Sequence, residues 1–318
     1  MTAEASSSRL KRWKKPLTIA FFLVLIVLFT LLARRIDWSD VLQTLGDFKL
    51  RTLLIAGVLT LCSFLVYASF DLIGRTYIRQ SLTWKQILPV GIISYAFNLN
   101  LSAWVGGIAM RYRLYSRLGV STGNIAKILG LSLATNWFGY MALAGVVFSS
   151  GLVTMPPGWK VSTFALQGIG VLLVLVSLGY LAACRFSTKR AWSIKGIEIN
   201  LPSLRMACLQ LALGALNWSL MAAVIFTLLP AKLDYPLVLG VLLISAIAGV
   251  VTHIPAGLGV LEAVFIGLLQ HEASRGSLLA GLIAYRAIYF ILPLLIALVM
   301  YLGVEAKAKA LRVRKTPA

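Results

Sequence analysis

Two charged residues, Glu262 and Arg286, lie inside long apolar stretches of the sequence. A charge inside a bilayer is costly, and it normally pairs with a partner or lines a pathway. At about 1.5 Å of rise per helical residue, both lie roughly 12 Å from the same membrane face. We therefore expect an ion pair, which is either purely structural or part of a site in which Arg286 binds an anionic substrate.

Arg111 is a further charge beside an apolar stretch, about 9 Å below the cytoplasmic interface at the same rise per residue. From that depth an arginine can snorkel to the interface while its stem stays on apolar surface. The sequence leaves open whether Arg111 snorkels or contacts a substrate.

Polar residues and helix breakers gather at two interruptions of the apolar pattern. The first holds Asn98, Asn100, Ser102, Gly106 and Gly107, and the second holds Thr252, His253, Pro255, Gly257 and Gly259. Irregular backbone at membrane depth must be buried in protein or line a wet cavity. A half-helix that restarts after Gly107 or Gly257 would present unpaired N–H groups, which bind anions such as phosphate. With Arg111, Glu262 and Arg286, these residues form the expected substrate-binding set.

The same residues also have plain structural interpretations. Glycine and proline can kink two ordinary helices, and Asn98 or Thr252 can satisfy a neighbouring backbone group. His253 beside Pro255 is more often a satisfied polar residue than a proton carrier. The sequence has no P-loop, HExxH, GxSxG or paired-cysteine motif and no acidic cluster, so we expect no catalytic residue, metal or cofactor.

The composition indicates which kind of protein must position these residues. The chain has 318 residues, of which 59% are hydrophobic and 13% charged. Soluble domains are less apolar and carry about twice that share of charge. The net charge of +20 could suggest a nucleic-acid partner, but the basic residues form short clusters between apolar runs. That pattern is typical of the positive-inside bias of a polytopic membrane protein.

Eight apolar regions divide the chain into candidate membrane segments of about 20 residues or more. They are Leu17–Ala33, Leu53–Phe70, Ile87–Val105, Ile125–Ser149, Phe164–Cys184, Met206–Leu229, Leu278–Val304 and the interrupted Leu237–Leu269. No linker separates them, so we expect one integral membrane domain over 1–318. Its ends are a basic N-terminus at 1–15 and a basic tail at 305–318.

The distribution of lysine and arginine predicts the topology. If 87–117 and 237–269 are re-entrant hairpins, 22 basic residues fall inside and 7 outside, with both termini cytoplasmic. The predicted fold is an all-α polytopic membrane protein with six full spans and two re-entrant helical hairpins in an inverted repeat.

The two hairpins also match each other in sequence. Placing Ser94 over Ser245 puts Gly106 over Gly257 and Arg111 over Glu262. Interrupted segments at matching places in two opposed halves indicate a transporter-type site near the middle of the membrane.

The sequence segments around both tips resemble the signature segments of the lysylphosphatidylglycerol synthetase/flippase transmembrane family. The segment from Ser94 to Tyr115 resembles its first signature, and the segment from His253 to Glu262, with Pro-Ala-Gly-Leu-Gly-Val-Leu-Glu, resembles its second. The similarity extends over nearly the whole chain and includes the YbhN-like bacterial inner-membrane subgroup. It implies a membrane part that moves aminoacylated phospholipid, which a separate soluble domain makes. Because the chain stops soon after its last span, we expect no transferase domain and no enzyme activity.

We therefore expect a lipid translocase of the bacterial inner membrane for an anionic phospholipid or a lipid-linked intermediate. Its expected partners are membrane phospholipid and, as a second expectation, a lipid-synthesis enzyme, and no nucleic acid. Two alternatives stay open: a secondary transporter or channel for a small ion or metabolite, and a non-transporting scaffold. A cavity that opens sideways to lipid favours translocation, a closed aqueous path favours a small solute, and the lack of any cavity favours a scaffold.

Overall fold

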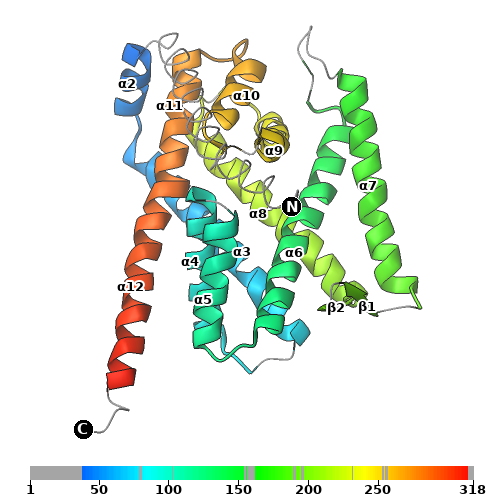
Figure 1. The fold of residues 1–318 in the computed structure, drawn as a ribbon. Helices are drawn as coiled ribbons and strands as arrows, with labels where there is room; N and C mark the ends of the chain where they lie inside the picture. The colour runs from blue at the N-terminus through cyan, green and yellow to red at the C-terminus, as the bar shows by residue number, and fades with distance from the viewer. Residues whose placement is uncertain are drawn as a thin grey trace, which may run out of the picture.

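The computed structural model describes residues 38–78, 81–101, 103–153, 155, 162–188, 191–194, 197–230, 232–252, 254 and 257–313. The predicted basic N-terminus at 1–15 and the predicted first span, Leu17–Ala33, lie outside these residues, as does the end of the basic tail. Figure 1 shows a bundle of helices with one small pair of strands at its edge.

Six helical segments in the described part of the chain are long and apolar enough to cross a membrane. They are α3 (Leu50–Ile78), α6 (Thr122–Ser149), α7 (Thr163–Phe186), α8 (Leu204–Leu228), α9 (Tyr235–Thr252) and the run Arg275–Val304. That run comprises α11 (Arg275–Tyr285), the π-helix η3 (Arg286–Ile291) and most of α12 (Leu292–Val313). Helices satisfy their backbone internally, as a bilayer requires. The predicted all-α multi-pass class is confirmed.

Serine residues mark where several of these helices begin. Ser121, Ser162, Ser203 and Ser274 each precede a helix and accept a hydrogen bond from the backbone N–H three residues later. Such N-caps satisfy one of the orphan donors at a helix start. The sequence therefore sets the starts of α6, α7, α8 and α11 locally, before any packing.

The outermost helices present apolar side chains to their surroundings. In Figure 1, α7 and α12 lie at opposite edges of the bundle. Leu172 and Leu175 on α7, and Leu295 and Val299 on α12, are all more than half exposed. In a multi-pass membrane protein such surfaces face hydrocarbon, whereas α3 and α8 pack against each other in the interior.

The described helices repeat with a shift of 151 residues, which is the separation of Ser94 and Ser245. The shift places α3 on α8, α4 (Trp84–Asn100) on α9, α5 (Met110–Arg117) on α10 (Val260–Leu269), and α6 on the run that begins at Arg275. The order and bounds of the helices therefore agree with the internal repeat inferred from the sequence. The opposed orientation of the two halves stays a prediction.

Each predicted hairpin corresponds to two helical limbs that pack against each other. After α4, the π-helix η1 (Ala103–Ala109) and α5 fold back along α4, and α10 packs against α9. The first limb of the second hairpin, α9, is nevertheless long enough to cross a membrane. The re-entrant path therefore stays a prediction.

Smaller elements complete the described part. Strands β1 (Ala191–Ile194) and β2 (Ile197–Asn200) form an antiparallel pair between α7 and α8, with Ala191 opposite Asn200. The short helix α2 (Trp38–Gly46) packs against α11.

Candidate functional site

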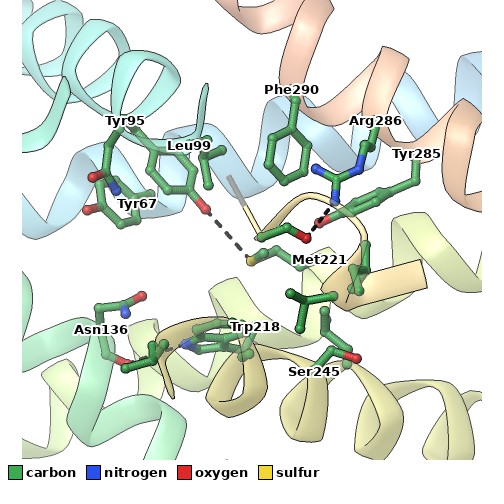
Figure 2. A pocket seen from close by; sticks show the side chains of 18 of the residues that line it. Tyr67, Tyr95, Leu99, Asn136, Trp218, Met221, Ser245, Tyr285, Arg286 and Phe290 are labelled. Atoms are coloured by element: carbon green, nitrogen blue, oxygen red, sulfur yellow. Dashed lines mark hydrogen bonds between the residues drawn. The ribbon is translucent and has the colours of Figure 1, made fainter. Parts of the chain in front are cut away.

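A cavity of about 350 Å³ lies between α4 and α9, the first limbs of the two predicted hairpins. Helices α3, α6, α8, α10 and α11 and the π-helix η3 complete its wall. Figure 2 shows Arg286, Tyr285 and Phe290 on one side of the cavity and Tyr67, Tyr95 and Asn136 on the other. The cavity thus has a cationic end and an uncharged end rich in aromatic and amide groups.

Matching residues of the two repeats face this cavity together. Four pairs separated by 151 residues line it: Tyr67 and Trp218, Tyr95 and Ala246, Asn98 and Gly249, and Leu99 and Val250. A space lined by both members of several such pairs lies where the repeats meet. Secondary transporters built from inverted repeats place their substrate sites at that interface.

The cationic end is an ion pair between Arg286 and Glu262. Arg286 Nε lies 2.5 Å from Glu262 Oε1, and Nη2 lies 3.2 Å from Oε2. Nη2 also donates to the Gly257 carbonyl at 3.0 Å, and the guanidinium lies 5.2 Å from the Phe290 ring centroid. The two side chains are only 15% and 16% exposed. The ion pair expected from equal membrane depth is therefore present.

Two glycines in left-handed backbone place Glu262 in this pair. Gly257 has φ +56° and Gly259 has φ +77°, where other residues are strained. Gly259 caps the start of α10, so the half-helix restarts at Val260, close to the predicted place. Glu262 lies in the first turn of α10, where the positive end of the helix dipole favours a carboxylate. Two predicted site residues of this tip, His253 and Pro255, lie outside the described residues.

The first tip differs from the prediction. Gly106 and Gly107 do not precede a half-helix: they lie inside the π-helix η1, which continues into α5. Both are buried, and a Cβ on Gly106 would overlap the Phe97 backbone, while one on Gly107 would lie 2.9 Å from Asn98 Oδ1. These glycines therefore serve close packing against α4, and the predicted restart of a half-helix after Gly107 is wrong.

The remaining polar residues of the tips lie in different places. Asn98 lines the cavity, whereas Asn100 donates to the carbonyls of Ala96 at 2.9 Å and Phe290 at 3.0 Å, and so ties α4 to η3. Thr252, the exposed last residue of α9, bonds back to the Gly249 carbonyl. Ser102 lies outside the described residues. Of these side chains, Asn98 is the one placed at the cavity.

Arg111 neither snorkels nor lines the cavity. It is 1% exposed, and its guanidinium binds the fully buried carboxylate of Asp71 on α3, with Nε to Oδ2 and Nη2 to Oδ1 both at 3.1 Å. Tyr115 donates to the same carboxylate at 2.9 Å, and Ser132 accepts from Arg111 at 3.3 Å. The network joins α3, α5 and α6 behind the cavity. Asp71, an acid at the end of an apolar run, is the partner that the sequence analysis missed.

A second network that the sequence analysis missed runs from the cavity wall into the core. Ser63 Oγ bonds Asn217 Oδ1 at 2.8 Å and the Tyr289 hydroxyl at 2.6 Å, and Tyr289 bonds the Tyr95 hydroxyl at 3.0 Å. These residues come from α3, α8, η3 and α4. In the sequence, the signal that could have indicated this network was single polar residues inside otherwise apolar helical segments. The network fixes the relative positions of helices from both repeats.

Comparison with known proteins shows the family to which the chain belongs. Residues 17–297 match the family described as the lysylphosphatidylglycerol synthase TM region. The chain belongs to this family, and it is a multi-pass membrane protein.

Individual relatives are similar over different lengths. The chain is 46% identical over 311 residues to inner membrane protein YbhN of Escherichia coli (strain K12), covering 96% of this chain and 98% of YbhN. It is 27% identical over 260 residues to uncharacterized protein slr0712 of Synechocystis, covering 81% and 80% of the two chains. It is 25% identical over 158 residues to phosphatidylglycerol lysyltransferase of Staphylococcus haemolyticus, which is 42% of this chain but 19% of that protein.

Proposed function

We propose that this protein moves a phospholipid, or a lipid-linked intermediate, between the two leaflets of its membrane. In this proposal the headgroup passes through the cavity between α4 and α9. The observation that carries the proposal is the cavity itself, because matching residues of both repeats line it and its wall combines Arg286 with aromatic and apolar side chains.

The rim of the cavity supports access from lipid. Leu133 and Val250 line the cavity and are 42% and 49% exposed. Leu133 lies near the middle of α6, and in this proposal it forms part of an opening of the cavity toward hydrocarbon. A cavity of about 350 Å³ is at the lower end of small-molecule sites. That size suits a headgroup whose acyl chains stay in the hydrocarbon.

Two further considerations favour lipid over a small solute. A relative that matches 42% of this chain is named for a phospholipid, phosphatidylglycerol, and the family takes its description from the synthesis of a phospholipid. A transporter of soluble metabolites would need a path closed to lipid, whereas exposed apolar side chains, Leu133 and Val250, line this cavity. We further propose that both termini are cytoplasmic, from the distribution of basic residues.

Reconstitution tests the proposal. Purified protein in liposomes should expose acyl-labelled fluorescent phospholipid of the inner leaflet to an impermeant quencher faster than protein-free liposomes do. Arg286→Gln should slow this exchange, whereas the matched control Arg275→Gln, at an exposed arginine on α11, should not. Exchange of every phospholipid at the protein-free rate would contradict the proposal. Uptake of small solutes without lipid exchange would instead support a secondary transporter.

A further inference from the structure

We infer that the cavity selects a zwitterionic phospholipid headgroup, with one phosphate and one ammonium group, and that Glu262 sets this selectivity. The inference rests on the proposed function and narrows its substrate class. It departs from the anionic headgroup that the sequence suggested, because Glu262 binds Arg286 through both carboxylate oxygens in the structure and so balances its charge.

The described residues give the site no net charge. Among those that line the cavity, Arg286 is the one charged side chain, and Glu262 already binds it through both carboxylate oxygens. The neighbouring pair of Asp71 and Arg111 is likewise neutral. A ligand therefore meets a cation whose charge is matched before the ligand arrives.

This neutrality decides which headgroup the site tolerates. A phosphate at Arg286 becomes the second anion on one cation, close to the carboxylate of Glu262. In a poorly solvated cavity an unbalanced charge is costly, and like charges at short range oppose binding. An ammonium group within the same headgroup restores neutrality, whereas a headgroup with only a phosphate leaves one negative charge unmatched.

The opposite side of the cavity can accept the ammonium group. Figure 2 shows Asn136 and Trp218 across the cavity from Arg286, and both line the cavity. Tryptophan gives the strongest cation–π attraction of the aromatic side chains, and an asparagine carbonyl accepts hydrogen bonds from ammonium. The two ends of the cavity thus match the two charges of one zwitterion.

Headgroup competition in proteoliposomes tests the inference. Vesicles of one fixed composition, equal parts phosphatidylethanolamine and phosphatidylglycerol, receive a trace of acyl-labelled phosphatidylethanolamine, phosphatidylcholine or phosphatidylglycerol. The wild-type protein should exchange the two zwitterionic probes about tenfold faster than phosphatidylglycerol, which corresponds to a difference of about 1.4 kcal/mol. Glu262→Gln gives the site a net positive charge, so this variant should prefer phosphatidylglycerol. Glu272→Gln, at an exposed acid beyond α10, is the matched control and should keep the wild-type order.

The outcomes separate the two claims. If no probe exchanges faster than in protein-free vesicles, the proposed function fails, and the inference fails with it. If wild-type protein exchanges lipid but handles phosphatidylglycerol as fast as or faster than the zwitterionic probes, the inference alone is wrong. The wild-type order needs no variant, so misfolding of Glu262→Gln cannot hide that result. A folded Glu262→Gln protein, shown by its melting temperature, that keeps the wild-type order would remove Glu262 as the selecting residue.

Discussion

Removing one partner of the buried pair of Asp71 and Arg111 should strongly destabilise the protein, because the other charge then stays buried without a balancing charge. Asp71 is fully buried and accepts hydrogen bonds from Arg111 Nε and Nη2 and from the Tyr115 hydroxyl. Asp71→Asn removes the charge that balances Arg111, and arginine stays charged at any accessible pH. Removing one partner of a buried ion pair costs about 3–5 kcal/mol. We expect that loss in the free energy of unfolding.

Arg111→Gln should cost less than Asp71→Asn, because Tyr115 still donates a hydrogen bond to the Asp71 carboxylate. The double variant Asp71→Asn with Arg111→Gln leaves no charge behind. It should therefore be more stable than the two single losses imply, with a coupling free energy of about 3 kcal/mol.

The assay is equilibrium unfolding in mixed micelles, in which the SDS fraction is raised and tryptophan fluorescence is followed. Arg113→Gln, at an exposed arginine two residues along α5, and Asp47→Asn, at an exposed loop acid, are the matched controls and should change little. Suppose that each single variant instead loses less than about 1 kcal/mol of unfolding free energy, and that the two losses simply add in the double variant. Those are the values of an exposed ion pair. That result would refute the reasoning from burial.

Three further predictions test the topology, the first tip and the expected lack of enzyme activity. In a variant without native cysteines, Thr122→Cys and Thr188→Cys should resist an impermeant thiol reagent applied to intact cells, whereas Glu272→Cys should react with it. Reaction at Thr122→Cys and Thr188→Cys would reject the hairpin topology. Gly106→Ala should lower the free energy of unfolding by about 1–3 kcal/mol or more, because its Cβ overlaps the α4 backbone. Gly130→Ala, with open space around its Cβ, should not. Equal melting temperatures of the two variants would show that the tip is loosely packed. Purified protein given aminoacyl-tRNA and phosphatidylglycerol should form no aminoacylated lipid, and product above a protein-free control would show that the chain is an enzyme.

The sequence was sufficient for features that local chemistry controls. Apolar runs set the helices, because a bilayer leaves the backbone no other partner, and the serine caps set their starts. The ion pair of Glu262 and Arg286 could be predicted because two isolated charges at equal depth leave few other partners. The restart of a half-helix after Gly257 could be predicted because glycine interrupts helices, and Gly257 and Gly259 do adopt the left-handed backbone that favours this residue.

Features that depend on packing between distant segments could not be read from the sequence. Gly106 and Gly107 look like helix breakers, but their role is the close approach of η1 to α4, which only the folded chain reveals. Arg111 could be placed in depth but not paired, because Asp71 lies 40 residues away on another helix. The cavity likewise needs residues from both repeats, and Asn136 and Trp218 carry no motif that marks them as lining it.

The most direct test of the account is whether lipid passes through the cavity, and one glycine allows that test. Gly249 on α9 lines the cavity, and a Cβ placed there meets no neighbouring segment within 4 Å, so Gly249→Phe adds a side chain to the lining without a clash at its Cβ. Gly179 on α7 also has open space and is exposed away from the lining, so Gly179→Phe is the matched control. The account predicts that Gly249→Phe stays folded and loses most phospholipid exchange in proteoliposomes, while Gly179→Phe exchanges lipid at the wild-type rate. A folded Gly249→Phe protein that exchanges lipid as fast as the wild type would contradict it.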